Sequence, residues 1–315
     1  MNSFRWVSTL IACVSLAQAP AALGVTPGQQ DTFSDGTTQG WVVGLLGSVP
    51  AKPPANVPSG GPAGANDPYL LLTADGGIGA GNRLTVINVS QWKGDYVSAG
   101  VVAIAMSLNN FGATELRLRL VFGDPSLNNE AISTQPIVLL PGSGWTSVVF
   151  PILPQDLNAV VGSVSAALSN ATLVRISHSP DGMIPGPSIV ASLGVDNVTA
   201  LADTDRDGIL DVGDDCTLVP NPAQIDADRD GFGNACDPDF DENGVVNFGD
   251  LAALKSRFFG RDPNTDLNGD GVVNFADLAI LKSLFFRAPG PSGLACAGQV
   301  PCLAMTPVIL SNSVP

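Results

Sequence analysis

The chain of 315 residues is long enough for two or three domains. Its 35 glycines, 25 prolines and a charged fraction of only 14% favour loop-rich β structure over helices. The net charge of −15 is concentrated in residues 203–277, which hold 18 acidic and 5 basic side chains. Nucleic acid phosphates reward clustered Lys and Arg, so this acidic chain is not expected to bind nucleic acid.

Residues 1–24 are typical of a secretory signal, with Arg5 as the basic region, an apolar stretch over 6–16 and small residues before 24. The tetrapeptide ending at Cys13 resembles a bacterial lipoprotein box, but the apolar stretch before it is too short, so we favour secretion over lipid anchoring. No later stretch reaches the ~18 apolar residues of a membrane helix. The mature chain then has four cysteines, an even count that fits disulfides in an oxidising compartment. They are Cys216, Cys236, Cys296 and Cys302.

Residues 25–202 are predicted to be all β, as a sandwich or jelly roll, because short runs with apolar–polar alternation are separated by Gly, Pro, Asn and Asp clusters. Leu116 to Leu120, with arginines between the leucines, shows the alternation best. The predicted strands are 69–73, 83–89, 100–108, 115–122, 135–140, 145–150, 173–178 and 188–201.

The pattern Phe-x-Asp-Gly-Thr-x-x-Gly-Trp over 33–41 resembles the start of laminin-B-type and carbohydrate-binding sandwiches. That resemblance implies a recognition domain for a glycan or a surface ligand. Trp41, Trp92, Tyr96 and Trp145 lie at predicted strand ends, where flat rings could form a sugar-stacking platform. The alternative, which we favour for each, is a place in the sandwich core.

One ligand pattern recurs four times between residues 203 and 277. Each twelve-residue loop has Asp or Asn at positions 1, 3, 5, 9 and 12 and Gly at position 6, and this spacing supplies the six to eight oxygens that calcium prefers. Position 7 would contribute its carbonyl, and position 9 a direct or water-bridged contact. The sequence therefore predicts calcium binding, with about four ions. The predicted ligands are Asp203, Asp205, Asp207, Ile209, Asp211 and Asp214; Asp226, Asp228, Asp230, Phe232, Asn234 and Asp237; Asp239, Asp241, Asn243, Val245, Asn247 and Asp250; and Asp266, Asn268, Asp270, Val272, Asn274 and Asp277.

The first two loops are not followed by helices, because Pro220 and Pro222 interrupt the chain after the first. Their Asp-rich runs, the Asn-Pro-x-Gln at 221–224 and the two cysteines closely resemble a thrombospondin type 3 repeat. The resemblance implies that the chain winds around calcium and that Cys216 pairs with Cys236. For Cys296 and Cys302, six residues apart, we favour a small disulfide loop over a free reactive pair.

The last two loops are each followed by a helical pattern, Phe248, Leu251, Leu254 and Phe258 in one and Phe275, Leu278, Leu281 and Phe285 in the other. The two halves, 27 residues apart, agree at 14 of 21 positions. A duplicated loop and exiting helix with Asp at position 12 resembles the type I dockerin, an EF-hand-like module. The domain boundaries that follow are 1–24, 25–202, 203–237, 238–288 and a Pro/Gly-rich tail, 289–315.

The dockerin resemblance also implies a cohesin-like partner protein, read by loop positions 10 and 11 and by the helix about one and a half turns later. Positions 10 and 11 are Phe followed by Gly or Ala here, where the family often has hydroxyl residues. The alternative is that a known cohesin does not bind and that the phenylalanines cap the module's own core. The near-identity of the halves implies two alternative docking orientations. The expected partner-binding residues are Phe248, Lys255, Ser256, Phe275, Lys282 and Ser283.

No catalytic motif stands out. His178 is the sole histidine and is expected to be structural, and no spacing singles out a carboxylate pair for glycoside hydrolysis. The carboxylates outside the calcium loops that could form one are Asp95, Glu115, Asp124, Glu130 and Asp156. We therefore expect a secreted, non-catalytic, calcium-binding modular protein. The alternatives are an accessory carbohydrate-binding component of a polysaccharide-degrading system and a glycoside hydrolase.

Overall fold

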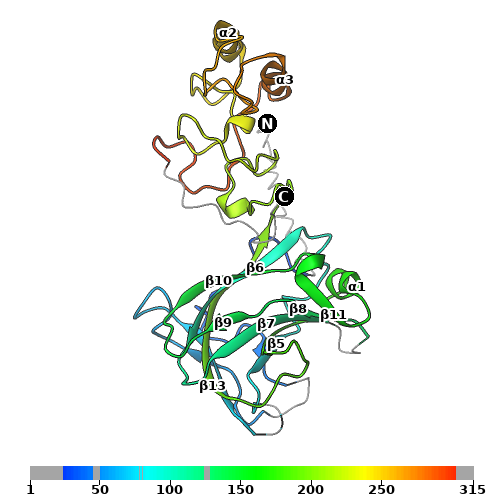
Figure 1. The fold of residues 1–315 in the computed structure, drawn as a ribbon. Coiled ribbons are helices and arrows are strands. Elements are labelled where there is room, and N and C mark those ends of the chain that lie inside the picture. The colour runs from blue at the N-terminus through cyan, green and yellow to red at the C-terminus, as the bar shows by residue number, and fades with distance from the viewer. Residues whose placement is uncertain (1–23, 45–49, 78, 80, 124–127, 303–315) are drawn as a thin grey trace, which may run out of the picture.

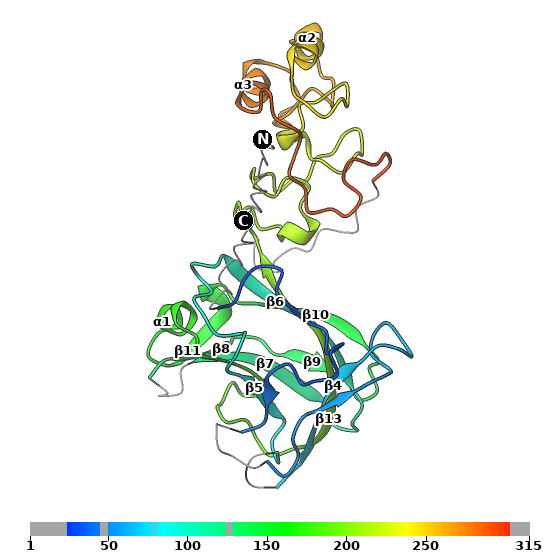
Figure 2. The ribbon, with the colours of Figure 1, turned by 180° about the vertical axis from the view of Figure 1, so that it is seen from behind.

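The computed structural model describes residues 24–44, 50–77, 79, 81–123 and 128–302 (Figure 1). A β-sandwich forms one end of the molecule, and a loop-rich C-terminal part rises from it and ends in two short helices (Figures 1 and 2). The predicted secretory signal lies outside the described residues apart from Gly24. No helix in the described ranges is long and apolar enough to cross a membrane.

Two antiparallel sheets face each other in the sandwich, as predicted. The first, called here the β6 sheet, has the order β10 (Thr146–Pro151), β6 (Val101–Asn110), β13 (Val190–Ala202), β4 (Tyr69–Asp75) and β3 (Ala55–Val57), with β1 (Gln30–Asp31) on β13. The second, the β7 sheet, has the order β11 (Leu157–Val161), β8 (Glu130–Ser133), β7 (Leu116–Gly123), β12 (Leu173–His178), β5 (Thr85–Asn88) and β2 (Trp41–Val42), with β9 (Ile137–Leu139) on β7.

The predicted strands are all present within a few residues, but several elements were missed. β1, β2, β3, β8 and β11 were not predicted, and the six-residue helix α1 (Val164–Ser169) has no repeat of its apolar face. Ser163 begins that helix by accepting a hydrogen bond from the Ala166 N–H at 3.1 Å. The 3₁₀ turn η1 (Pro154–Asp156) was also not predicted.

The aromatic side chains divide between the core and the surface. Trp41, Trp92 and Tyr96 are at most 1% exposed, so the core alternative holds for these three. Trp145 is only partly buried: its ring lies against Gly194, where a Cβ would come within 2.8 Å, and its indole donates to the Gly60 carbonyl at 2.9 Å. Trp145 therefore belongs to the outer surface of the β6 sheet.

A buried carboxylate organises the tryptophans of the core. One oxygen of Asp31, a residue 3% exposed, accepts hydrogen bonds from the indoles of Trp41 and Trp92, both at 2.7 Å. The Gln91 amide donates to the same group at 3.0 Å. Burial raises the pKa of Asp31, and these donors oppose the rise. Asp31 of β1 thus accepts hydrogen bonds from the buried N–H groups of two large aromatic side chains.

The C-terminal part continues directly from β13. Leu210, in the first Asp-rich loop, is fully buried against Ala103 of β6 and Leu201 of β13, with Val149 of β10 beside them. Farther on, the 3₁₀ turns η2 (Asp211–Gly213) and η3 (Asn234–Cys236) precede the helices α2 (Phe248–Ser256) and α3 (Phe275–Ser283). The predicted helices are therefore confirmed, but both end before Phe258 and Phe285.

We predict that Asp31→Ala destabilises the sandwich by about 2 kcal/mol or more, because two buried indole N–H groups lose their acceptor. For a domain of this size, this lowers the Tm of the β transition by roughly 4–8 °C in thermal unfolding followed by circular dichroism. The matched control is Asp35→Ala, which removes an exposed carboxylate that accepts hydrogen bonds from Thr37. An equal fall in Tm for both variants would contradict the role assigned to Asp31.

Asp196 gives a second prediction, on pH. It is fully buried; one oxygen accepts from the Asn197 N–H at 2.8 Å, and the other has no hydrogen-bond partner within the described residues. Burial raises its pKa to about 6, with a smaller contribution from Asp67. The charged form is thus disfavoured in the folded state. The free energy of unfolding therefore falls as pH rises from the ordinary pKa of 3.8 to the folded-state pKa of about 6. Asp196→Asn should stabilise the sandwich by about 1–3 kcal/mol at pH 7 and by nothing near pH 4, measured by urea unfolding. Asp75→Asn, at an exposed position, is the control; a gain independent of pH would refute the assignment.

Candidate metal centre

The four Asp-rich loops share one backbone frame. In each, the carboxylate at position 1 accepts a hydrogen bond from the N–H of the glycine at position 6, at 2.6–3.1 Å. The side chain at position 5 accepts from the N–H of position 7, at 2.8–3.2 Å. These two bonds fold each loop back on itself and turn the side chains at positions 1, 3 and 5 toward one point.

This backbone frame explains why position 6 is glycine. It also shows a left-handed conformation at position 4, which was not predicted from the sequence. The position-6 glycines have φ between +84° and +95°, a conformation that residues with a Cβ rarely adopt. Position 4 is left-handed as well: φ is +66° for Arg206 and Arg229, +53° for Glu242 and +69° for Gly269. A non-glycine residue at positive φ costs free energy, and only Gly269 in the fourth loop could have signalled this from sequence.

Acidic side chains gather in three of the loops. Carboxylate oxygens of Asp203, Asp205 and Asp207 lie within 4.8 Å of one another, as do those of Asp226, Asp228 and Asp230, and those of Asp239, Asp241 and Asp250. Burial, followed by the neighbouring carboxylates, raises the pKa of Asp205 and of Asp228 to about 6. Burial and then Asp230 raise that of Asp237 to about 8. Both causes, burial first and the neighbouring carboxylates second, disfavour the charged forms in a partly dehydrated loop.

Some of the loop carboxylate oxygens have no hydrogen-bond partner among the described residues. One oxygen each of Asp205, Asp214 and Asp250 is buried without a hydrogen bond to any described residue. Buried carboxylate oxygens are costly unless something positive satisfies them, and all-oxygen sites of this spacing suit a hard divalent cation. The side chains present therefore fit calcium, which would remove the repulsion and use the unpartnered oxygens.

Position 9, predicted to bind directly or through water, has other contacts. Asp211 accepts from the N–H and the hydroxyl of Thr204, both at 2.7 Å, and Asn234 accepts from the Ala227 N–H at 3.0 Å. Asn247 and Asn274 cap the starts of α2 and α3 in capping boxes. These side chains join the start of each loop to its end or begin a helix.

Position 12 differs between the third and fourth loops. Asp250 accepts from the Asn247 N–H through one oxygen at 2.7 Å and leaves the other unpartnered. Asp277 accepts from the Asn274 N–H in the same way, but its second oxygen accepts from the N–H groups of Leu267 and Asn268 at 2.8 and 3.2 Å. The fourth loop thus holds its terminal carboxylate more firmly in protein hydrogen bonds than the third.

The connection between the first two loops supplies contacts that the ligand pattern does not include. The Asn221 N–H donates to Asp207 at 2.9 Å, and the Gln224 amide donates to Asp214 at 2.8 Å. Asp215, buried beside them, accepts from the Asn221 amide, and burial raises its pKa to about 6. The Asn-Pro-x-Gln run was the sequence signal for this connection. No sequence pattern pointed to a role for Asp215.

Both predicted disulfides are present, Cys216–Cys236 and Cys296–Cys302. The tail, whose path was not predicted from the sequence, folds back over the first two loops. Gly293 donates to the Asp214 carbonyl at 2.8 Å, Gly298 to Asp230 at 2.7 Å, and Cys302 to Arg229 at 2.7 Å. Residues 289–302 therefore cover the first two loops, while the rest of the tail lies outside the described residues.

The third and fourth loops each pair with the segment that follows the helix of the other half. The Val246 N–H donates to the Arg287 carbonyl, and the Phe286 N–H donates to the Val246 carbonyl. In the same way, the Val273 N–H donates to the Gly260 carbonyl, and the Phe259 N–H donates to the Val273 carbonyl. Val246, Val273, Leu254 and Leu281 are fully buried and form the small core of this module with Leu267. The two sequence repeats therefore form two equivalent halves of the module. Each half supplies backbone hydrogen bonds and core side chains to the other.

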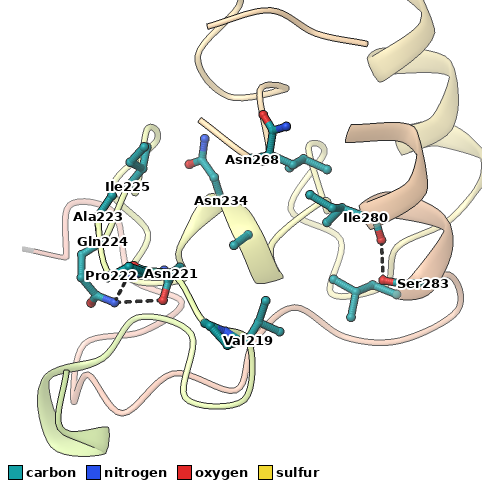
Figure 3. A pocket seen from close by; sticks show the side chains of 14 residues that line it. Val219, Asn221, Pro222, Ala223, Gln224, Ile225, Asn234, Asn268, Ile280 and Ser283 are labelled. Carbon is teal, nitrogen blue, oxygen red and sulfur yellow. Dashed lines mark hydrogen bonds between the residues drawn. The ribbon is translucent and has the colours of Figure 1, made fainter. Parts of the chain in front are cut away.

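The expected partner-binding residues are on the surface. Lys255, Ser256, Lys282 and Ser283 are exposed, and Phe248 and Phe275 are each 69% exposed. Ser283 also borders a groove of about 350 Å³ between α3 and the 219–225 connection, which Figure 3 shows with Ile225 and Ile280 on its sides. The 219–225 connection therefore lies beside α3, a proximity that the sequence duplication alone would not predict.

The family comparisons agree with this geometry. The model of the dockerin type I domain matches residues 238–286, and that of the thrombospondin type 3 repeat matches residues 202–224. Both predicted module assignments are thereby confirmed, and with them the presence of calcium-binding modules. The sandwich before them is confirmed by its two sheets.

Particular relatives share only short segments. Cartilage oligomeric matrix protein of Mus musculus is 56% identical over 62 residues, which are 16% of this chain and 8% of the relative. Thrombospondin-4 of Bos taurus is 59% identical over 34 residues, 11% of this chain and 4% of the relative. The chain therefore spans less than a tenth of the length of these curated relatives.

Two solved structures are similar in part. A type II cohesin-dockerin domain from Bacteroides cellolosolvens is 28% identical and covers 20% of this chain and 92% of that chain, with a TM-score of 0.16. The family 11 carbohydrate-binding module from Clostridium thermocellum, in complex with a β-1,3-1,4-mixed-linked tetrasaccharide, is 13% identical and covers 56% of this chain and 97% of that chain, with a TM-score of 0.39. At these TM-scores, neither likeness assigns a ligand or a partner to this chain.

We predict that removal of calcium with EDTA unfolds residues 203–302 and leaves the sandwich folded, because the C-terminal core is small and its acids repel one another. Limited proteolysis of the mature chain should cut within 203–302 only after chelation, while the far-ultraviolet β signal persists. Calorimetry should count about four ions, and Asp203→Ala should lose one. Asp262→Ala, an acid of the same module outside the loops, should lose none. Fewer than two ions, or α2 and α3 unchanged in EDTA, would disprove this assignment.

Proposed function

We propose that the chain is a secreted, non-catalytic adaptor, in which the β-sandwich recognises a ligand and the dockerin-like module attaches it to a cohesin-like partner protein in the presence of calcium. The observation that carries this proposal is a pair of exposed aromatic triads on that module. Phe248 contacts Phe285 and Phe286, with ring centroids 5.1 and 6.1 Å apart. Phe275 contacts Phe258 and Phe259 in the same way, at 5.0 and 6.5 Å.

Each triad combines the position-10 phenylalanine of one half with the two phenylalanines that end the other half. Phe259 and Phe286 are 75% and 69% exposed, as open to solvent as Phe248 and Phe275. Exposed apolar surface of this kind is typical of interaction sites, and four such rings are unusual on so small a module. The two triads are equivalent by the duplication, which supports the expectation of two docking orientations.

A non-catalytic role is supported by how the sandwich holds its carboxylates. Asp95 caps a turn at Ser98, Glu115 is ion-paired with Arg117 at 2.8 Å, and Glu130 lies beside Arg175. His178 accepts from the Arg117 N–H through Nδ1 at 3.1 Å, and burial lowers its pKa, which fits a neutral structural histidine. Asp124 lies outside the described residues.

The runner-up, an accessory carbohydrate-binding component, differs only in what the sandwich binds. A ligand-sized pocket on the β7 sheet, lined by a buried ion pair, favours it. Under either function, the calcium-loaded loops position the docking surface and the sandwich carries the recognition.

Docking should depend on the helix residues of both halves. We predict that calcium-loaded mature chain retains a partner from the source secretome in a pull-down, and that EDTA abolishes retention. Lys255→Ala alone or Lys282→Ala alone should weaken it only a few-fold, because the other orientation remains, whereas the double variant should lose most of it. The double variant of the sandwich, Lys52→Ala/Lys93→Ala, is the control for loss of positive charge. Retention unaffected by the Lys255→Ala/Lys282→Ala double variant would count against this surface.

A further inference from the structure

A pocket of about 270 Å³ lies on the outer face of the β7 sheet. Thr85 and Ile87 of β5, Arg175 of β12 and Glu130 of β8 line it. Their strand neighbours Val86, Val174, Ile176 and Ala131 are in the sandwich core, so strand alternation turns the four lining side chains outward. Arg175 lies directly opposite Ile87 in the β12–β5 ladder.

The loop after β12 closes one side of this pocket and is held in place by hydrogen bonds. Arg119, on the same outer face, donates to the carbonyls of Ser179 and Pro180 at 2.8 and 3.2 Å. Ser179 donates to the Met183 carbonyl at 2.8 Å, and the next residues, Ile184 and Pro185, form the apolar wall. The pocket is therefore preformed by the fold, as small-molecule sites generally are.

The floor of the pocket holds an ion pair that the protein leaves incompletely satisfied. The side chains of Arg175 and Glu130 are only 12% and 7% exposed, and their closest nitrogen and oxygen are 3.7 Å apart. That separation is too long for a hydrogen bond. Oε1 of Glu130 is buried and accepts no hydrogen bond from any described residue. A buried ion pair is stabilising only when its remaining donors and acceptors are satisfied, so this pair has capacity for a ligand.

The chemistry of the pair selects the ligand. The guanidinium donates hydrogen bonds and the carboxylate accepts them. A hydroxyl group can accept from the guanidinium through its oxygen and donate to the carboxylate through its O–H. Two adjacent hydroxyls can bridge the pair without separating it. Because the pair has no net charge, an anion would be repelled by Glu130 and a cation by Arg175. The apolar wall suits the C–H face of a ring. The volume is just below the ~300 Å³ at which pockets for drug-sized ligands begin, so one ring fits better than a long chain.

We propose that this pocket binds one neutral sugar unit of a glycan, with adjacent hydroxyls hydrogen-bonded to Arg175 and Glu130 and the ring packed on Ile184 and Pro185. The proposal rests on the recognition role of the sandwich in the function above. It is independent of docking, which uses the opposite end of the molecule. It also differs from a stacking platform at Trp145, whose indole N–H donates to Gly60 and whose ring contacts Tyr69 and Phe111.

The test is an array of neutral and uronic-acid oligosaccharides, probed with calcium-loaded full-length mature chain, followed by titration of the best ligand. We expect binding to neutral glycans, weakened at least tenfold in Glu130→Gln and in Arg175→Met. Because a single change leaves one buried charge unpaired, the double variant Arg175→Met/Glu130→Leu keeps the site neutral and apolar; it should unfold like the wild type and still fail to bind. The matched control is Arg117→Met/Glu115→Leu, which removes an exposed ion pair on the neighbouring strand and should bind normally.

Each other outcome overturns the proposal in a distinguishable way. Neutral glycan binding that is lost in Trp145→Ala but kept in the Arg175→Met/Glu130→Leu variant would place recognition on the β6 sheet and leave the proposed function standing. Arg175-dependent binding of uronic acids, or of a free amino acid in a parallel titration, would replace the neutral ligand with a charged one. Absence of binding to every probe, with docking intact, would refute the pocket and the recognition role of the sandwich but not the docking role.

Discussion

The C-terminal part of the molecule depends on one hydrogen bond that is made four times, from the N–H of a position-6 glycine to the carboxylate at position 1. This bond closes a turn that only glycine adopts without strain, and by closing it the loop brings further carboxylates within a few ångströms. The same contact that shapes the loop therefore creates the repulsion that opposes it. A bound divalent cation resolves the conflict, because it converts the closely spaced oxygens from a cost into ligands.

Little else in this part of the chain would hold it together. The buried apolar cluster of the dockerin-like module consists of Val246, Leu254, Leu267, Val273 and Leu281. The loops before it rely on the Cys216–Cys236 disulfide and on the tail that returns over them. A disulfide that closes about twenty residues contributes roughly 3 kcal/mol in the chain-entropy model, which assists folding but does not neutralise the acids. We therefore expect metal binding and folding to be coupled in this part of the chain.

The two ends of the molecule are joined by packing as well as by the chain. β13 runs from the centre of the β6 sheet directly into the first loop, and Leu210 of that loop is buried on the outer face of the sheet. Ordering of the first loop therefore also orders the junction. The sandwich, in contrast, has a large core and buried hydrogen bonds such as those of Asp31, and needs no ion for these contacts. A stable recognition end and an ion-dependent docking end suit a chain that presents one binding partner to another.

Sequence by itself determined the calcium loops, the helices and the sandwich class, because each follows from local spacing: ligands within twelve residues, and apolar residues at a period of two or about 3.6. The Cys216–Cys236 pairing was implied by the resemblance to a thrombospondin type 3 repeat, and the Cys296–Cys302 loop was favoured over a free reactive pair. The sequence also assigned exposed positions to Lys255 and Lys282. Tertiary structure decided what depends on distant segments meeting. Asp31 accepts hydrogen bonds from both Trp41 and Trp92; the tail covers the first loops; and Phe248 makes an edge-to-face contact with Phe285 of the other half. Arg175 and Glu130, 45 residues apart in the sequence, meet only because β8, β7 and β12 are neighbours in one sheet, and pairing between distant strands leaves no short-range pattern to read.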